Sequence, residues 1–310
     1  MTALRSYDAS RIKTRRRKNR RRASNAEMEE RAEFLIDYAE EHGPITVRGL
    51  YYQAEVAGLP GIDKSQSSYA KVQRQVLGLR REGRLGYQHI ADMTRWMRKP
   101  KTHNSLGDAI ADAVSCYRRS LWRDADTYVE VWCEKDALAG VILPVTAEYD
   151  VPLMVARGFV SETFAYEAVA ARRGDFRPYY VYYLGDFDRS GQDAARSLEE
   201  KLTRFADEEG IQVVFQTIAI TERQVRGYDL PTRPPKRNTS ADEAWPHDFA
   251  CELDAMAPDD LRGLVEDAIN AHIDQDQLRI MEVAEASERE IGGGIVAMAR
   301  RQMKRARAAK

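Results

Sequence analysis

The stretch YYVYYLGDFDRSG, residues 179–191, decides the fold class of this chain of 310 residues. Five of its first six residues are aromatic or β-branched, which is typical of a buried strand. Asp186 and Asp188 follow at the point where that strand ends. Because residues two apart project to the same side of an extended backbone, we expect the two carboxylates to lie side by side. Gly185 and Gly191 are expected to relieve the tight turn into the next helix.

The segments around this stretch alternate between strand and helix patterns. Strands are predicted at 127–134, 152–156, 179–185 and 211–220, and helices at 136–148, 161–173 and 191–208. Alternation at this spacing predicts a parallel sheet with right-handed crossovers, which is an α/β domain. A Pro-rich loop at 230–237 and helices from Pro258 follow, and the glycines at 292–294 are expected to interrupt the last helix.

The N-terminal part has a purely helical pattern and is expected to form a separate domain. Ser24 and Glu27 fit a capping box that begins a helix ending near Gly43. A second and a third helix flank a turn at 58–63, and a short strand or hairpin is expected after Gly83. Three helices followed by a small β element are typical of a winged helix. A small helical bundle is the alternative.

One face of the third predicted helix is basic. If the domain is a winged helix, this helix is the one that enters the major groove of DNA. If the domain is a plain bundle, the same face is simply solvated. The candidate DNA-binding residues are Lys71, Arg74, Arg80 and Arg81.

The net charge of −1 hides a very uneven distribution of charge. Residues 1–24 carry a net charge of +9 and residues 300–310 carry +6, which leaves −16 between them. The run RIKTRRRKNRRR at 11–22 holds nine positive charges in twelve residues and is expected to be disordered on its own. Such a run favours nucleic-acid binding through counterion release, and a solvated tail is the simpler alternative.

The composition excludes several classes of protein. No apolar run approaches the ~20 residues needed to cross a bilayer, so no membrane association is expected. The basic N-terminus lacks the apolar stretch of a secretory signal. Cys116, Cys133 and Cys251 are widely spaced, which argues against a disulfide framework or a zinc site. We therefore expect a cytoplasmic protein, associated with the nucleoid if it binds DNA.

Carboxylates at two strand ends predict a metal site. In open α/β sheets, ligands bind beyond the carboxyl ends of the strands. Glu134 ends an earlier strand and can face the same crevice as Asp186 and Asp188. Hard oxygen ligands of this kind suit Mg²⁺. The simpler alternative is that the Asp-x-Asp pair caps a turn or the next helix.

These acidic residues resemble the Toprim pattern of topoisomerases, bacterial primases and some nucleases. That pattern has a Glu at one strand end and, two crossover units later, an Asp-x-Asp followed by a Gly. The resemblance implies that Glu134, Asp186 and Asp188 handle Mg²⁺ and phosphoryl chemistry.

A second motif narrows the resemblance. The segment TVRGLYY, residues 46–52, resembles the T-x-R-[D/E]-[I/L]-[Y/F]-Y motif of the type IIB topoisomerase (topoisomerase VI) A subunit and its relative, the meiotic double-strand-break protein. In that family a winged helix bearing the catalytic tyrosine precedes a Toprim domain. The resemblance covers about residues 30–270 and implies that Tyr52 is the nucleophile with Arg48 beside it. Gly49 departs from the motif, which has an acidic residue there.

The resemblance implies a reaction and partners. Tyr52 would attack the phosphate of double-stranded DNA and form a 5′-phosphotyrosyl bond, leaving a free 3′-hydroxyl. In the family the tyrosine of one protomer works with the metal site of another, which implies a homodimer. The chain has no Walker A loop, so strand passage would require a separate ATPase (B-type) subunit. Compact, free-standing proteins of this type are associated with viruses and other mobile elements.

Two other functions remain open from the residues alone. The first is a Toprim-type nuclease in which water attacks the phosphate and Tyr52 only packs. The second is a non-catalytic DNA-binding protein. The predicted organisation is a basic tail (1–24), a winged helix (25–100), a connector (101–126), a Toprim core (127–225), its C-terminal extension (226–299) and a second basic tail (300–310).

Overall fold

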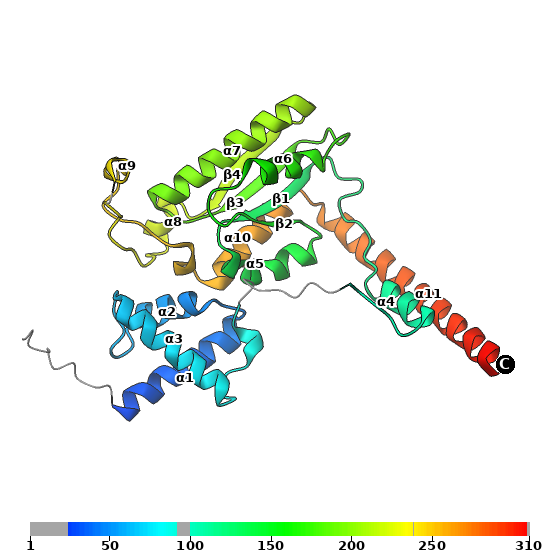
Figure 1. The fold of residues 1–310 in the computed structure, drawn as a ribbon, viewed down its shortest axis with the longest axis horizontal. Helices are drawn as coiled ribbons and strands as arrows, with labels where there is room; N and C mark the ends of the chain where they lie inside the picture. The colour runs from blue at the N-terminus through cyan, green and yellow to red at the C-terminus, as the bar shows by residue number, and fades with distance from the viewer. Residues whose placement is uncertain (1–23, 92–99, 238, 309–310) are drawn as a thin grey trace, which may run out of the picture.

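The computed structural model describes residues 24–91, 100–237 and 239–308 (Figure 1). The basic run at 11–22 therefore lies outside the described residues. Figure 1 shows a helical N-terminal part below an α/β part, with one long helix projecting from the α/β part. Within the described ranges, no helix is both long and apolar enough to span a membrane.

Three helices form the N-terminal part: α1 (Asn25–His42), α2 (Val47–Val56) and α3 (Gln66–Arg81). The capping box predicted at Ser24 and Glu27 is present and begins α1. The helices pack around a small core that includes Leu35, Leu50 and Val72, all fully buried. Their order and bounds agree with the helices predicted there.

The β element expected after Gly83 is not formed in residues 84–91. A 3-10 turn, η2 (Tyr87–His89), occupies this segment, and Ile90 makes a single bridge to Ile45. The reason is local, because Gly83 turns the chain at φ 75° and η2 follows only four residues later. The remainder of the predicted element, residues 92–96, lies outside the described residues.

The α/β part contains a four-stranded parallel sheet, as predicted. Its strands are β1 (Tyr128–Cys133), β2 (Leu153–Val155), β3 (Tyr179–Leu184) and β4 (Val213–Ala219), in the order β2-β1-β3-β4. The crossover helices are α5 (Asp136–Glu148), α6 (Glu162–Ala170) and α7 (Arg189–Glu209). The first and last residues of each helix lie within two residues of the predicted ones, except that α6 ends three residues early.

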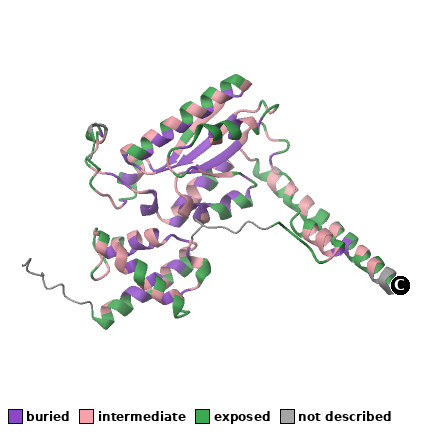
Figure 2. Cartoon of the chain, in the orientation of Figure 1, coloured by how far each residue is buried: buried purple, intermediate pink, exposed green. Residues whose placement is uncertain are grey.

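Both faces of the sheet are covered, and the two central strands, β1 and β3, are almost wholly buried, whereas β2 and most of β4 at the edges are only partly buried (Figure 2). Alternate strand residues face opposite sides, so Val131 and Tyr182 pack with α5, whereas Trp132 and Tyr183 pack with α6 and α7. One carboxylate, Glu130 of β1, is buried as well. It accepts hydrogen bonds from the hydroxyls of Tyr128 and Tyr179 and from the Trp132 indole, which satisfies its oxygens.

The chain after β4 completes the α/β part and then leaves it. It forms α8 (Glu222–Gly227), α9 (Ser240–Glu243), η3 (Leu253–Ala255), α10 (Pro258–Asn270) and α11 (Gln275–Ala308). Helix α10 packs on α5, and η3 lies against α2 of the N-terminal part. Helix α11 is the projecting helix, and α4 (Leu106–Ser115) of the connector packs along it (Figure 1).

The prediction that glycines 292–294 interrupt the last helix is wrong. Helix α11 continues through them to Ala308, so residues 300–308 of the basic tail are helical too. Three glycines cost roughly 3 kcal/mol of helix propensity. Packing on α4 explains one of them, because a Cβ on Gly292 would come within 2.8 Å of the Val114 side chain.

Asp175, in the turn before β3, provides a test of the fold at low pH. Its hydrogen bonds from the Arg177 side chain lower the pKa of Asp175 to about 2. A depressed carboxylate pKa contributes stability above the unfolded pKa of ~3.9, and this stability is lost as the pH falls through the folded value. Because the carboxylate is 28% exposed, we expect Asp175→Asn to cost only about 1–2 kcal/mol at neutral pH.

The measurement is urea unfolding of both proteins across the acid range. The difference between wild type and Asp175→Asn should shrink as the pH falls through that range. Asp207→Asn, on the exposed side of α7, is the control and should change the free energy of unfolding by less than ~0.5 kcal/mol at any pH. A difference at Asp175 that is independent of pH would contradict the assignment.

Candidate active site at the strand ends

Glu134 and Asp186 meet beyond the carboxyl ends of β1 and β3. The two strands are adjacent, so the residues that follow Cys133 and Leu184 emerge at the same edge of the sheet. One carboxylate oxygen of Glu134 accepts a hydrogen bond from the backbone N–H of Asp186 at 2.9 Å. The crevice expected from the sequence therefore brings these two acidic residues together.

Asp188 points to a different partner from Asp186. Asp186 accepts from the backbone N–H of Leu253 and from Lys135, each at 2.8 Å. Asp188 is the N-cap of α7, accepting from Gly191 N–H at 2.9 Å, and its other oxygen accepts from Arg233 at 3.0 Å. The expected side-by-side arrangement assumed extended backbone, but β3 ends at Leu184. Asp188 therefore caps α7, as the simpler alternative for the Asp-x-Asp pair would have it.

Two further carboxylates, Glu252 and Asp254, lie in the same place. Asp254 is buried, accepting from Thr46 Oγ1 at 2.7 Å and from Lys135 at 2.9 Å. Glu252 pairs with Arg48 and also approaches Arg233 at 3.4 Å. Sequence reasoning singled out neither residue, although both are acidic positions in the otherwise apolar segment CELDAM. An acidic residue inside an apolar, buried segment needs a charged or hydrogen-bonding partner, and this pattern was the signal that could have identified both residues.

These contacts link the N-terminal and α/β parts through one network of charges, called the ionic cluster here. It contains five carboxylates and three cations, so its net charge is −2 when every group is ionised. Its members are Arg48, Glu134, Lys135, Asp186, Asp188, Arg233, Glu252 and Asp254.

Burial makes the negative charge of the ionic cluster costly. It raises the pKa of Glu134, and the neighbouring charge of Asp186 raises it further. Burial also raises the pKa of Asp186, against the opposing effect of Lys135. For Lys135 itself burial disfavours the charged form, but Asp254 and Asp186 outweigh it and raise the pKa of the ammonium. Glu134 and Asp186 are therefore more easily protonated than free carboxyl groups, and the surplus of negative charge is held at an energetic cost.

Of the two adjacent tyrosines on α2, Tyr52 is the one beside the ionic cluster. The Tyr51 ring is buried in the N-terminal core, and its hydroxyl donates to the backbone carbonyl of Asp63 at 2.9 Å. Tyr52 is half-buried and packs against both the N-terminal core and the core beneath the sheet. Burial and the charge of Glu252 raise the pKa of Tyr52, while Arg48 opposes the increase. A phenolate at Tyr52 would therefore need added positive charge.

The four basic residues predicted to contact DNA do not share one face of α3. Arg74 and Arg81 are exposed on its outer side. Lys71 is half-buried and donates to the carbonyl of Gly61 at 2.6 Å. Arg80 stacks on the Tyr87 ring, with its guanidinium carbon 4.2 Å from the ring centroid. Arg74 and Arg81 are thus the two whose charge is directed to solvent.

The ionic cluster fits a divalent cation by its chemistry, although its carboxylates do not converge on one point. In the described ranges, no three Asp, Glu, His or Cys side chains form a ready metal centre. Lys135 and Arg233 lie against Asp186 and Asp188 instead. The oxygen-only donor set and the surplus of two negative charges nevertheless match Mg²⁺. Glu134 is the first candidate ligand, because it forms no ion pair among the described residues.

A groove of about 690 Å³ opens beside the ionic cluster. It runs between the end of α2 and the Pro-rich loop, and its charged lining residues are Lys64, Arg226 and Arg233 against Asp229 and Asp248. Arg233 therefore faces both the groove and Asp188. A phosphate-bearing ligand in this groove would meet cationic side chains next to the carboxylates.

Gly191 gives a test of how tightly the site is built. A Cβ on this residue would lie 2.3 Å from the backbone oxygen of Asp186, a contact that only backbone movement can relieve. We expect Gly191→Ala to lower the free energy of unfolding by about 2–3 kcal/mol. Urea denaturation measures this change in the free energy of unfolding. Gly263→Ala, in α10 with nothing within 4 Å, is the control and should raise stability by up to about 1 kcal/mol. Equal effects of the two substitutions would contradict the close approach.

No protein-family model matches the chain, and no curated protein matches it significantly.

Proposed function

We propose that this protein cleaves double-stranded DNA by tyrosine transesterification, in the manner of the topoisomerase VI A subunit. One observation carries the proposal. Arg48, one helical turn before Tyr52, is ion-paired to Glu252, which shares its cations with Asp186 and Asp188. The two motifs that resemble this family are distant in sequence, and their residues join one ionic cluster.

The architecture is consistent with the domains that the resemblance implies. A parallel four-stranded sheet with acidic residues beyond two adjacent strands supports a Toprim assignment. Three packed helices support a winged-helix assignment for the N-terminal part, without a wing in residues 84–91. Double-stranded DNA is then the substrate, and Arg74 and Arg81 are the residues of α3 best exposed to contact its phosphates.

The reaction assigns a role to each residue. The Tyr52 phenol oxygen forms a bond to phosphorus while the bond from phosphorus to the 3′-oxygen breaks, and the 3′-oxygen gains a proton as the phenol loses one. Arg48 is placed to stabilise the developing phenolate or to bind the scissile phosphate through two parallel hydrogen bonds. Because the phosphodiester energy is kept in the phosphotyrosyl bond, the break can be resealed.

Glu134, Asp186 and Asp188 would hold Mg²⁺. When bound, the ion neutralises negative charge at the phosphate. Lys135 and Arg233 contribute positive charge at the same place and position Asp186 and Asp188 through their ion pairs. The separate ATPase subunit implied by the resemblance is needed only for strand passage.

The experiment is incubation of the full-length protein with supercoiled plasmid and Mg²⁺ or Mn²⁺, stopped with detergent. Linear or nicked DNA that enters a gel only after proteinase K treatment supports the proposal, because protein is then attached to the DNA end. Cleavage that needs no protease, leaving free 5′-phosphates, identifies the water-dependent nuclease instead. Intact plasmid with both metals contradicts both reactions.

The nuclease is a real second candidate because burial and Glu252 raise the pKa of Tyr52. A phenol that holds its proton tightly is a poor nucleophile, and water activated at the carboxylates would replace it. The same gel assay distinguishes the two, since only the tyrosine reaction attaches protein to DNA.

The resemblance implies that tyrosine and metal site act between two protomers, whereas Arg48 and the carboxylates are linked here within one chain. Mixing inactive Tyr52→Phe with inactive Glu134→Gln distinguishes the arrangements. If catalysis occurs between protomers, a mixed dimer has one intact site and nicks DNA. If it occurs within one chain, the mixed dimer has none, and no activity returns.

A further inference from the structure

The last turns of α11 carry positive charge that has no acidic partner within the described chain. Residues 300–308 contain five basic side chains and no acidic one. Arg301 and Arg305 are exposed, and neither forms an ion pair with a residue in the described ranges. They are four residues apart, so they project from the same face of the helix. By contrast, Arg173 and Arg204 of the α/β part are also exposed, and each pairs with a glutamate.

The charges in the first half of α11 hold the helix in place. Glu285 accepts a hydrogen bond from the backbone N–H of Arg119 at 2.7 Å, and Glu288 binds the guanidinium of the same arginine at 3.0 Å. Arg289 donates to the Tyr117 carbonyl at 2.9 Å. The direction of the helix is therefore fixed well before its basic end.

The helix dipole does not account for the positive charge. Basic side chains stabilise the last turn of a helix because its free carbonyl groups carry partial negative charge. This effect falls off within one turn, whereas Arg300 and Arg301 lie about two turns before Ala308, where α11 ends. Their charge is therefore available to a partner outside the chain.

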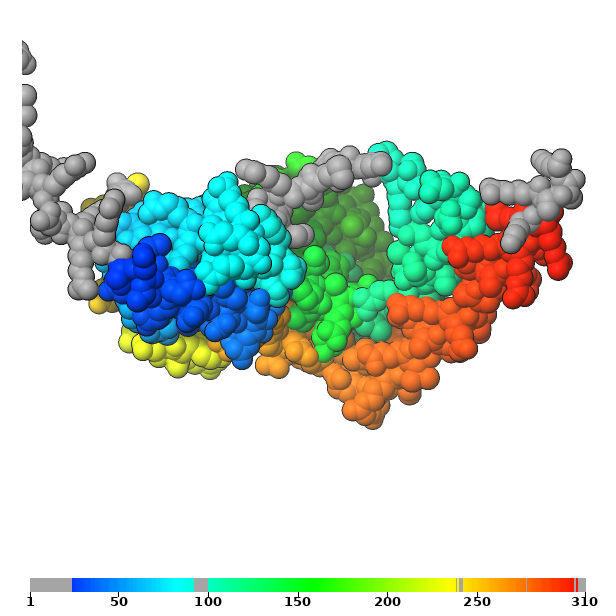
Figure 3. Space-filling view, turned by 90° about the horizontal axis from the view of Figure 1, so that it is seen from below, coloured from blue at the N-terminus to red at the C-terminus, as the bar shows by residue number. Residues whose placement is uncertain are grey.

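The end of α11 lies on the same side of the sheet as the N-terminal helices. Figure 1 and Figure 3 place the two at opposite extremes of the molecule, and both lie below the sheet in the view of Figure 1. Arg301 is about 39 Å along the helix axis from Gln275, where α11 begins. Arg74 and Arg81 of α3 are likewise exposed without an ion pair in the described ranges. A long polyanion running along this side would meet both groups of arginines.

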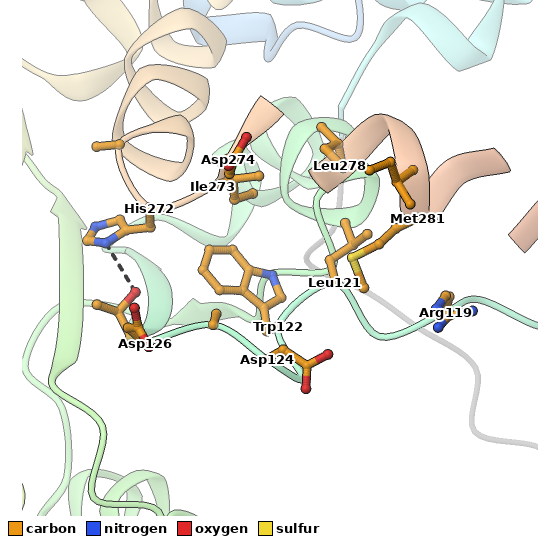
Figure 4. Close-up of a pocket in the computed structure, with 14 residues that line it drawn as sticks. Arg119, Leu121, Trp122, Asp124, Asp126, His272, Ile273, Asp274, Leu278 and Met281 are labelled. Carbon is orange, nitrogen blue, oxygen red and sulfur yellow. Dashed lines mark hydrogen bonds between the residues drawn. The ribbon is translucent and has the colours of Figure 1, made fainter. Parts of the chain in front are cut away.

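The root of α11 is acidic and would repel such a polyanion. A pocket of about 740 Å³ lies there, with Leu121 and Trp122 of the connector opposite Leu278 and Met281 of α11 (Figure 4). The Asp, Glu, Lys and Arg residues that line it are Asp124, Asp126, Asp274 and Arg119. A polyanion is therefore expected to meet α11 only near its end.

We infer that the end of α11 is a second, sequence-independent contact for duplex DNA, which binds phosphates of the flanking duplex at a distance from the ionic cluster. Guanidinium groups bind phosphate oxygens through charge-assisted hydrogen bonds, and counterions are released from the DNA. Helix α11 lies beyond residues 30–270, so the family resemblance does not imply this contact. It rests on the proposed function only for the identity of its ligand.

An anionic membrane surface is the other partner that a helix with apolar and basic side chains can bind. Ile295 and Met298 are exposed near the basic end of α11. A helix that lies on such a surface carries basic side chains along its polar face. Residues 276–290 contain five acidic and two basic side chains instead. The charge pattern therefore favours DNA, which needs to touch the end alone.

The first test is the affinity of the full-length protein for a duplex of about 40 base pairs, measured by fluorescence anisotropy without metal at several salt concentrations. Arg301→Gln with Arg305→Gln should raise the dissociation constant about tenfold or more in about 0.1 M salt. It should also reduce the slope of the salt dependence by about 2, because each phosphate contact contributes about 0.9.

Arg196→Gln with Arg204→Gln is the matched control. It removes the same two charges from the exposed side of α7 and should change the dissociation constant less than about twofold. Far-UV circular dichroism and thermal melting check that both variants are folded. Equal effects of the two pairs of substitutions overturn the inference.

The second test is the length of the duplex. A duplex of about 12 base pairs is about 41 Å long, too short to reach from the ionic cluster to Arg301. The variant of Arg301 and Arg305 should bind this duplex within about twofold of wild type. An equal loss with both duplexes overturns a contact with the flanking DNA. Loss of binding to phosphatidylserine vesicles, with DNA affinity unchanged, assigns the surface to a membrane.

Failure of this contact and failure of the proposed function give different results. If DNA affinity depends on Arg301 and Arg305 but plasmid is never cleaved, the contact stands and the proposed cleavage is wrong. If plasmid is cleaved with a protein adduct but the variant binds DNA as wild type does, the cleavage stands and the contact is wrong.

Discussion

Tyr52→Phe is expected to abolish the covalent protein–DNA adduct and to reduce cleavage at least about a thousandfold, because it removes the atom that attacks phosphorus. The loss should not come from unfolding. Tyr52 is half-buried, its ring packs between the two cores, and phenylalanine preserves that packing. The measurement is the amount of DNA end that remains attached to protein after a detergent stop, with thermal melting to confirm the fold.

Tyr51→Phe is the matched control on the same helix. It removes the hydrogen bond to the Asp63 carbonyl and should cost about 1 kcal/mol of stability while the adduct still forms. The two substitutions are chemically identical and adjacent, so a general effect on α2 would appear in both. Loss of the adduct in Tyr51→Phe with retention in Tyr52→Phe would reassign the nucleophile. Retention of the adduct in both would place the nucleophile at a third residue, whereas cleavage without any adduct in the wild type would leave water as the attacking group.

The fold could be read from the sequence where local patterns and burial agree. The strand at 179–184 and the helix at 136–148 are each specified by a continuous apolar or amphipathic run, and the crossover rule then gives a parallel sheet. The helix through 292–294 could not be predicted from propensity. Contact with Val114, far away in sequence, explains why Gly292 is placed there.

The candidate site was predictable only in part for a related reason. Glu134 and Asp186 follow adjacent strands, so topology alone brings them together. Glu252 and Asp254 reach the same place from a loop whose path depends on tertiary packing. Their role became visible only through the cations that they share with Asp186 and Asp188. Asp188 lies four residues beyond the end of β3, where it caps α7 and turns towards Arg233 and not to the side of Asp186.

Lys135→Met should lower the free energy of unfolding by about 3–5 kcal/mol, because it leaves buried carboxylates without their shared cation. Lys135 contacts Asp186, Asp254 and Glu252, at 2.8, 2.9 and 3.7 Å. Lys201→Met is the matched control, since that ammonium donates one hydrogen bond to the Val160 carbonyl and should cost only about 1 kcal/mol. Urea denaturation of the three proteins without metal gives the comparison.

Magnesium should then rescue Lys135→Met more than it stabilises wild type. The substitution changes the net charge of the ionic cluster from −2 to −3, so a divalent cation neutralises a larger surplus and binds more tightly. Thermal melting with increasing Mg²⁺ measures this, and the melting temperature of Lys201→Met should follow that of wild type. If Mg²⁺ stabilises none of these proteins, the ionic cluster is a structural link between the two parts and not a metal site. If Lys135→Met is no less stable than Lys201→Met, the carboxylates are not coupled through Lys135. The inferred connection from Asp186 to Arg48 and Tyr52 would then be wrong.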